Sequence, residues 1–175
     1  MTTQLSDSEK IVIREVFMNP HATLDDIATI LNKERKKKWK EDQRFQKNVD
    51  VRTISKFKSV GLKKIRRGLE ELASTSRLDL SLQNEQEERE LNILQRNGIL
   101  SGHDFRIDRK VYIFYTVSEG YILWQEHVCN VKCQDQCNEI LNLIRTEHGL
   151  SESSNDKLTR EHFEETFEEI ISREM

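Results

Sequence analysis

The hydrophobic period of the sequence changes partway along the chain, and this change constrains the fold more than any other feature. Before residue 98 the apolar residues recur at intervals of three and four, which is the spacing of one helix face. From Val111 to Val117 two sets of side chains alternate, as in a β-strand; residues 118–120 (Ser-Glu-Gly) then provide a turn, and Tyr121 to His127 predict a return strand. We therefore expect a mainly α-helical chain with a small antiparallel β-hairpin.

Two short helices are predicted at the start of the chain. Ser6 and Glu9 have the spacing of a capping box, and the apolar residues that follow keep helical spacing until Asn19-Pro20 ends the helix. Thr23 can cap a second helix, in which one face carries Leu24, Ile27, Ala28 and Leu31. Two helices joined by a tight turn are the beginning of a helix-turn-helix.

Charge is segregated along the chain. The stretch from Lys33 to Arg67 holds 15 Lys and Arg against four acids, while the remaining 13 bases and 27 acids (28 − 15 and 31 − 4) leave a balance of −14 elsewhere. Such asymmetry is typical of a polyanion-binding face on an otherwise acidic body. The alternative is a solvated helical surface, but that would normally intersperse both signs, so we favour a nucleic-acid contact.

The basic stretch contains an insertion and a candidate recognition element. The insertion, residues 33–48, predicts either a basic arm or an exposed helical extension, in which Trp39 and Phe45 pin the segment to the domain or stack on bases. Residues 50–74 combine an apolar stripe with a cationic face, and Gly61 is expected to divide them into two pieces. The sequence does not indicate which of the two enters a DNA groove. The candidate DNA-binding residues are Lys36, Lys37, Lys38, Lys40, Arg52, Thr53, Lys56, Lys63 and Arg67.

Two segments carry a resemblance to a known family. Leu5–Leu31 resembles the first two helices of archaeal and bacterial winged-helix regulators, and Leu91–Asp108 is similar to the junction after the recognition helix in Lrp/AsnC-type regulators. The resemblance implies a winged helix-turn-helix that binds double-stranded DNA and regulates transcription. It does not imply amino-acid sensing, because the residues after 127 are too few for that family's ligand-binding domain.

Three cysteines lie close together after the predicted hairpin. If the strand end supplies His127 and Cys129, and successive helical turns supply Cys133 and Cys137, a tetrahedral zinc site or an iron-sulfur site is feasible. The alternatives are core packing, because Cys133 and Cys137 continue into an apolar stripe, and a thiol switch. An odd number of cysteines in a reducing compartment argues against a disulfide framework.

The remaining features divide the chain and limit its function. We expect a winged helix-turn-helix domain at 1–127, a Cys-containing helix at 128–150, and a linker with a last helix at 151–175. The apolar stripe of that last helix, which includes Phe163 and Phe167, must pack on the body or on a second copy, and we favour a homodimer.

The sequence also predicts where the protein works and what it does not do. There is no apolar run long enough for a membrane and no secretory h-region, so we expect a cytoplasmic protein. No phosphate-binding loop, nucleophile elbow or zinc-protease motif occurs, so we do not expect an enzyme. Two alternative functions are a winged-helix protein-interaction module of a transcription or remodelling assembly, and a single-strand or RNA binder.

Overall fold

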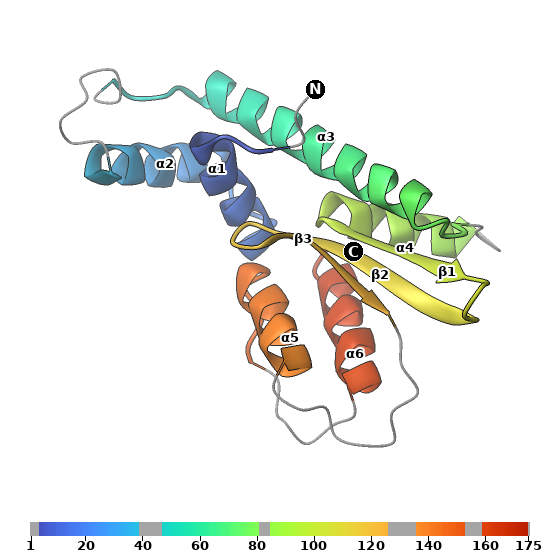
Figure 1. The fold of residues 1–175 in the computed structure, drawn as a ribbon. Helices are drawn as coiled ribbons and strands as arrows, with labels where there is room; N and C mark the ends of the chain where they lie inside the picture. The colour runs from blue at the N-terminus through green and yellow to red at the C-terminus, as the bar shows by residue number, and fades with distance from the viewer. Residues whose placement is uncertain (1–3, 39–46, 81–84, 126–135, 153–158, 175) are drawn as a thin grey trace.

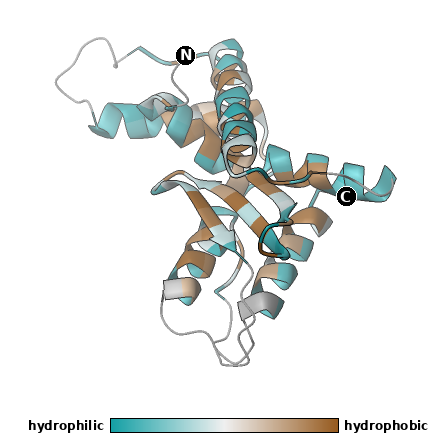
Figure 2. Ribbon diagram, turned by 45° about the vertical axis from the view of Figure 1, so that its right-hand side comes forward, coloured by the Kyte–Doolittle hydropathy of each residue, from teal (hydrophilic) through white to brown (hydrophobic). Residues whose placement is uncertain are grey.

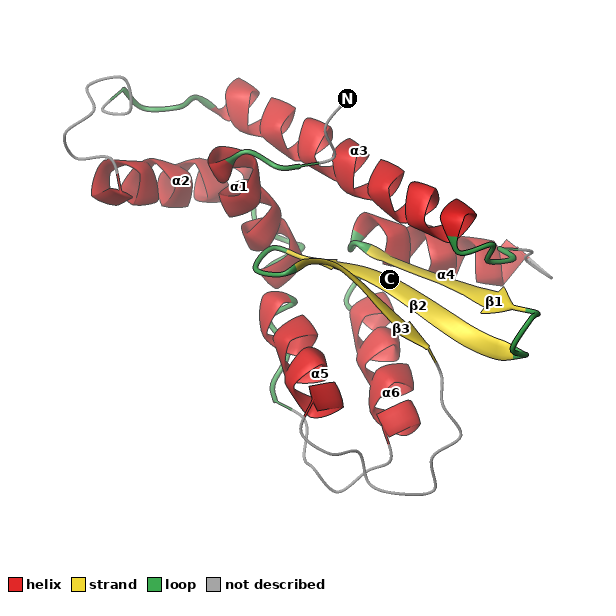
Figure 3. Ribbon diagram, in the orientation of Figure 1, coloured by secondary structure: helices red, strands yellow, loops and turns green. Residues whose placement is uncertain are grey.

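The computed structural model describes residues 4–38, 47–80, 85–125, 136–152 and 159–174, which form a mixed α+β fold (Figure 1). This confirms the predicted class of helices with a small antiparallel sheet. In chain order the elements are α1 (Asp7–Met18), α2 (Leu24–Lys38), α3 (Val51–Thr75), α4 (Glu85–Arg96), β1 (Ile99–Asp104), β2 (Arg109–Thr116), β3 (Gly120–Gln125), α5 (Gln136–Glu147) and α6 (Thr159–Ser172) (Figure 3).

The first two helices begin where their capping residues predict. The Ser6 hydroxyl accepts from the Glu9 N–H at 3.3 Å, and the Glu9 carboxylate accepts from the Ser6 N–H at 2.7 Å, which is the capping box. Thr23 and Asp26 form the same reciprocal pair before α2, at 3.2 and 3.0 Å. Helix α1 ends at Met18, immediately before Asn19-Pro20. The predicted boundaries of this helical hairpin are therefore confirmed.

Helix α3 is a single helix of 25 residues, so the expectation that Gly61 divides it was wrong. Gly61 lies on the buried face of α3, where an added Cβ would stand 2.9 Å from Cγ1 of Ile13 in α1. The glycine lets two helices approach closely without interrupting either one. In the sequence, this glycine indicates a helix break. In the structure, glycine is required there because α1 packs closely against α3.

The predicted hairpin forms β2 and β3 of a three-stranded sheet in the order β1-β2-β3, in which β2 is the central strand. Strand β1, which the sequence analysis did not identify, pairs with β2 from Ile99 opposite Phe114 to Asp104 opposite Arg109. Both faces of β2 are covered. Ile113 and Tyr115 pack against α1 and α3, while Tyr112 and Phe114 pack against α5 and α6.

The turn between β2 and β3 is anchored to the body. The Glu147 carboxylate, at the end of α5, accepts from the Val117 N–H at 2.6 Å and from the Ser118 N–H at 3.0 Å. The turn of the predicted hairpin is therefore fixed to the end of α5, while Ser118 and Glu119 within it remain exposed. Its return strand β3 is described as far as Gln125, and His127 lies outside the described residues.

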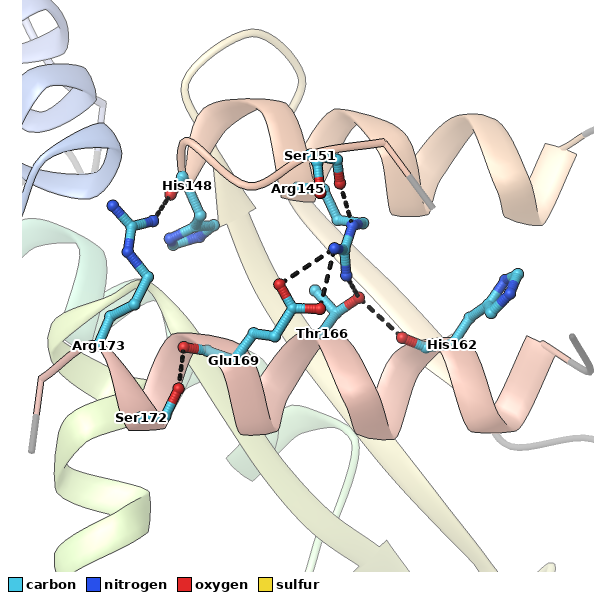
Figure 4. A network of polar contacts seen from close by, with 8 residues as sticks. All are labelled: Arg145, His148, Ser151, His162, Thr166, Glu169, Ser172 and Arg173. Carbon is cyan, nitrogen blue, oxygen red and sulfur yellow. Dashed lines mark hydrogen bonds and ion pairs between the residues drawn. The ribbon is translucent and has the colours of Figure 1, made fainter. Parts of the chain in front are cut away.

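Helices α5 and α6 are joined by a buried cation (Figure 4). Arg145, which is 4% exposed, donates to the Thr166 hydroxyl at 2.9 Å and to both oxygens of Glu169 at 2.9 and 3.1 Å. The apolar stripe of α6 is buried in the same unit, with Phe163 1% exposed. The stripe thus packs on its own sheet, which is one of the two alternatives the sequence left open, and the homodimer stays a prediction. Among the described residues, no helix is both long enough and apolar enough to cross a membrane.

A second glycine of α3 provides a test of how the helix is seated on the sheet. The Tyr121 hydroxyl of β3 donates to the Lys64 and Ile65 carbonyls at 3.2 and 3.3 Å, and a Cβ on Gly68 would lie 2.0 Å from that oxygen. Burial raises the pKa of Tyr121 to about 12, so the phenol keeps its proton and remains a donor. We expect Gly68→Ala to lower the free energy of unfolding by about 1–3 kcal/mol through overpacking, although alanine itself favours a helix.

Urea denaturation of a double-mutant cycle checks this expectation. In a Tyr121→Ala background the clash partner is gone, so Gly68→Ala should be neutral or stabilising there. An equal cost in both backgrounds would show that the Tyr121 contact is not the cause.

Candidate nucleic-acid interface

The solvent face of the first half of α3 is a stripe of cations and hydroxyls. Its members recur at helical spacing and are all exposed: Arg52, Ser55, Lys56, Ser59 and Lys63. The opposite face buries Ile54, Gly61 and Ile65. Figure 2 shows hydrophilic colour along α2 and the outer side of α3, whereas the strands are mainly hydrophobic. We call these five exposed residues the α3 stripe.

Contacts with α1 and α2 hold α3 firmly in place. The Asp50 carboxylate caps the helix by accepting from the Thr53 N–H at 2.7 Å, and hydrogen bonds from Thr53 hold the pKa of Asp50 below its usual value. Ile54 is fully buried in a cluster with Val12 of α1 and Ile27 of α2. Thr53 therefore serves the start of the helix, and the outward stripe is presented on a rigid element.

An ion pair ties the middle of α3 to α1. Lys64 Nζ lies 2.7 Å from the carboxylate of Glu9, which is 6% exposed. Burial alone would raise the pKa of Glu9, but hydrogen bonds from Lys64 and Ser6 hold it below its ordinary value. Lys64 is thus occupied in the body of the protein and does not belong to the stripe.

The cations of α3 differ in whether a carboxylate accompanies them. Arg66 and Arg67 each pair with the residue four positions later, Glu70 at 2.9 Å and Glu71 at 2.7 Å. In the described part of the chain no carboxylate lies within ion-pair distance of Arg52, Lys56 or Lys63. Positive potential is therefore concentrated at the N-terminal half of α3. Arg67, a predicted contact, is exposed but largely neutralised by Glu71.

The end of α2 adds further cations beside the start of α3 (Figure 1). Asn32 holds the two segments together, because its side chain accepts from the Val49 N–H at 2.7 Å and donates to the Val49 carbonyl at 3.1 Å. Lys36 and Lys37 are exposed on the helical extension of α2.

Two other residues of this region, Lys38 and Lys40, were also predicted to contact DNA. Lys38 pairs with Asp7 of α1 at 2.9 Å and thereby lowers the pKa of that carboxyl. Lys40, with Trp39 and Phe45, lies outside the described residues.

A groove between α3 and α4 adjoins the stripe. It encloses about 600 Å³ and takes Lys63 and Arg66 from one wall and Arg89 and Arg96 from the other. Glu85 and Glu88 of α4 also line it, so its charge is mixed. The groove extends the polar surface beyond the α3 stripe. Its positive charge is partly offset by the two glutamates.

The candidate metal site is only partly described. Cys137 is half-buried and packs against the core between the sheet and α5–α6, while His127, Cys129 and Cys133 lie outside the described residues. Among the residues that are described, no group of three His, Cys, Asp or Glu could hold a metal ion. A zinc or iron-sulfur site formed by these four residues thus stays a prediction.

Sequence reasoning missed two members of the stripe and one feature that bounds it. Ser55 and Ser59 follow from helical phase alone, because they lie three and seven positions after Arg52. The pairing of Arg66 and Arg67 with Glu70 and Glu71 is also readable as i, i+4 spacing. No family model matches the chain, and no curated protein or solved structure matches it either.

Proposed function

We propose that this chain is a double-stranded DNA-binding transcription regulator of the winged helix-turn-helix type. The observation that carries the proposal is the α3 stripe, in which Arg52, Lys56 and Lys63 are exposed without carboxylate partners among the described residues. A helix that enters the major groove needs long cations for phosphates and small hydroxyls for base edges on its outer face, and an apolar face that holds it to the domain. Helix α3 has both.

The dimensions of the stripe suit a duplex groove. From Arg52 to Lys63 the helix rises on the order of 16 Å, at 1.5 Å per residue, and the major groove is about 12 Å wide. Lys36 and Lys37 of α2 then serve the flanking phosphates. A homodimer, which we retain as part of the proposal, would present two such helices to successive half-sites.

Duplex-binding affinity measured across a salt series tests the proposal. The slope of log K against log salt is negative for a protein that contacts phosphates. We expect the triple variant Arg52→Gln, Lys56→Gln, Lys63→Gln to make this slope less steep by about 2.7, since each lost phosphate contact removes about 0.9. Affinity should fall for all sequences at low salt. Fluorescence anisotropy with one labelled duplex and its single strand gives both slopes and compares the two substrates.

The same helix provides the matched control. Arg66→Gln with Arg67→Gln also removes cations from exposed positions of α3, but Glu70 and Glu71 already neutralise these two. We therefore expect a smaller change of slope per residue than in the triple variant. Equal slopes for the wild type and the triple variant, or tighter binding to the single strand than to the duplex, would contradict the proposal.

A further inference from the structure

A second cavity among the described residues lies between α4 and α6, away from the α3 stripe. It is a groove of about 750 Å³ whose floor is formed by β1 and β2. The buried side chains of Leu94, Tyr112 and Phe167 close its bottom. The ends of the two walls are joined, because the Asn97 amide after α4 donates to Glu174 after α6 at 2.9 Å.

Both walls present the same pattern of side chains. Each helix contributes two glutamates and two apolar residues at positions i, i+3, i+4 and i+7, which lie on one face of a helix. On each wall, two carboxylates therefore stand next to two apolar side chains. On α4 these residues are Glu87, Glu90, Leu91 and Leu94, and on α6 they are Glu164, Phe167, Glu168 and Ile171. The groove is therefore apolar along its bottom and acidic along both rims.

The charge of the groove is opposite to that of the α3 stripe. Its lining includes six carboxylates and one lysine, Lys110. The formal net charge of the lining is therefore −5, with His103 counted as neutral. The carboxylates are Asp79, Glu87, Glu90, Asp108, Glu164 and Glu168. Such a surface repels nucleic acid and attracts a cationic partner.

An exposed aromatic residue stands on a fixed turn at the groove. Phe105, in the turn from β1 to β2, lines the cavity and is 69% exposed. Arg106 holds this turn by pairing with Asp104 at 2.5 Å and by donating to the Ser76 carbonyl at 3.0 Å. Arg106 also holds the pKa of Asp104 at about 2, so the ion pair persists at all ordinary pH values. Ile107, 42% exposed, extends the apolar surface beside Phe105.

We propose that this groove binds a basic amphipathic helix of a partner protein. The occupant is a helix whose apolar stripe enters the groove and whose Lys or Arg residues flank that stripe on both sides, where they meet the two acidic rims. Phe105 and Ile107 pack against the end of the stripe. The interaction is separate from DNA binding, because the groove and the α3 stripe share no residue.

A second copy of this chain is a poorer match for the groove. The basic helices α2 and α3 use their apolar faces in the protein's own interior, as shown by Ile27 and Ile54, which are 1% and 0% exposed. Within the described residues, α2 and α3 of a second copy could present these cations but not an apolar stripe beside them. The pattern of the groove therefore favours a different protein.

Binding of a model peptide tests the proposal. The probe is a fluorescent peptide of about 14 residues that contains only Leu and Lys, with Leu at helical i, i+3, i+4, i+7 spacing. A peptide of the same composition in scrambled order is the control for charge alone. By anisotropy with the full-length protein, we expect the amphipathic peptide to bind at least about tenfold tighter than the scrambled one.

Matched variants locate the binding site. Glu90→Gln with Glu168→Gln keeps side-chain shape and should weaken the amphipathic peptide about three- to tenfold, because two rim charges are lost. Glu119→Gln with Glu152→Gln makes the same charge change at exposed positions outside the groove and should leave affinity unchanged within about twofold. Neither pair should change duplex affinity by more than that factor, so failure here is distinguishable from failure of the proposed DNA binding.

Three outcomes would overturn the proposal. They are equal binding of the two peptides, equal weakening by both pairs of substitutions, and loss of a homodimer in the Glu90→Gln, Glu168→Gln variant during sedimentation. The last would assign the groove to a second copy of the chain.

Discussion

Replacing Phe163 by alanine is expected to lower the free energy of unfolding by about 3–5 kcal/mol. Phe163 is 1% exposed, and its ring centroid lies 4.0 Å from that of Trp124 and within about 6 Å of those of Phe114 and Phe167. Loss of the ring removes its transfer free energy and leaves a cavity that these neighbours cannot fill. A loss of this size is a large part of the 5–15 kcal/mol typical of a domain.

Phe105→Ala is the matched control, since the same atoms are removed from a position that is 69% exposed. We expect it to change the free energy of unfolding by less than about 0.5 kcal/mol. Urea denaturation monitored by tryptophan fluorescence and by circular dichroism measures both. A cost below about 1 kcal/mol for Phe163→Ala would mean that α6 does not share the core of the sheet.

Acidification is expected to destabilise the protein through His148, well above the pH at which carboxylates protonate. Burial, with a smaller effect of the Arg173 charge, lowers the pKa of His148 from 6.5 to about 3. The ring stacks on Phe17 of α1 at 5.0 Å. Arg173 donates to the His148 carbonyl (Figure 4), and it also donates to the Met18 carbonyl at 3.0 Å. Charging this ring would place an unpaired cation where α5 meets α1.

The direction of the effect follows from proton linkage. Below pH 6.5 the unfolded chain takes up a proton at His148, whereas the folded protein does not until about pH 3. Stability is thus fully present above pH 6.5 and falls with pH at about 1.4 kcal/mol per unit, by roughly 2.5 kcal/mol at pH 4.5.

His148→Phe tests this by removing the titration while keeping a ring on Phe17. Between pH 6.5 and 4.5 the free energy of unfolding of this variant should fall less steeply than that of the wild type. The difference in slope should be about 1.4 kcal/mol per pH unit, which corresponds to one proton. Carboxylates with lowered pKa, such as Asp104, are present in both proteins and cancel in the comparison. Parallel pH profiles for the two proteins would show that His148 is not the group responsible.

Local signals predicted the helix ends because their causes are local. A capping residue such as Ser6 or Thr23 bonds to a backbone N–H three positions later, and Pro20 removes a donor from the next turn. The segregated charge is likewise a property of the chain, and it directed attention to α2 and α3. Gly98, which follows α4 at φ +76°, is a local signal of the same kind, because glycine adopts this backbone conformation readily.

The role of Gly61 could not be read in the same way. Glycine in a helical pattern can mean a break or a close approach, and the difference depends on Ile13, which lies 48 positions earlier. Whether α3 is one helix or two then decides which residues share its outer face. This affects Lys63, which lies beyond Gly61, whereas Ser55 and Ser59 precede the glycine and follow from the phase of the first turns alone.

The sheet illustrates a second limit. The alternating residues of β2 are apolar on both faces, which is typical of a strand covered on both sides, yet the strand pattern by itself does not name the covering elements. Strand β1 contains a polar Ser-Gly-His sequence and is held by pairing with β2, not by its own propensity. The hairpin could therefore be predicted from the sequence, but β1 and the helices on the two faces of β2 could not.

The sequence by itself determined both ends of α1, the start of α2, the alternation of β2 and the basic character of residues 33–67, because each depends on neighbours within a few positions. Only the tertiary structure decided that α6 buries Phe163 and Phe167 against the sheet and that Lys64 and Lys38 are used in internal ion pairs. It alone also showed that α4 and α6 enclose an acidic groove. These contacts join residues tens of positions apart, and a stripe or a charge in the sequence does not specify the surface that it will meet.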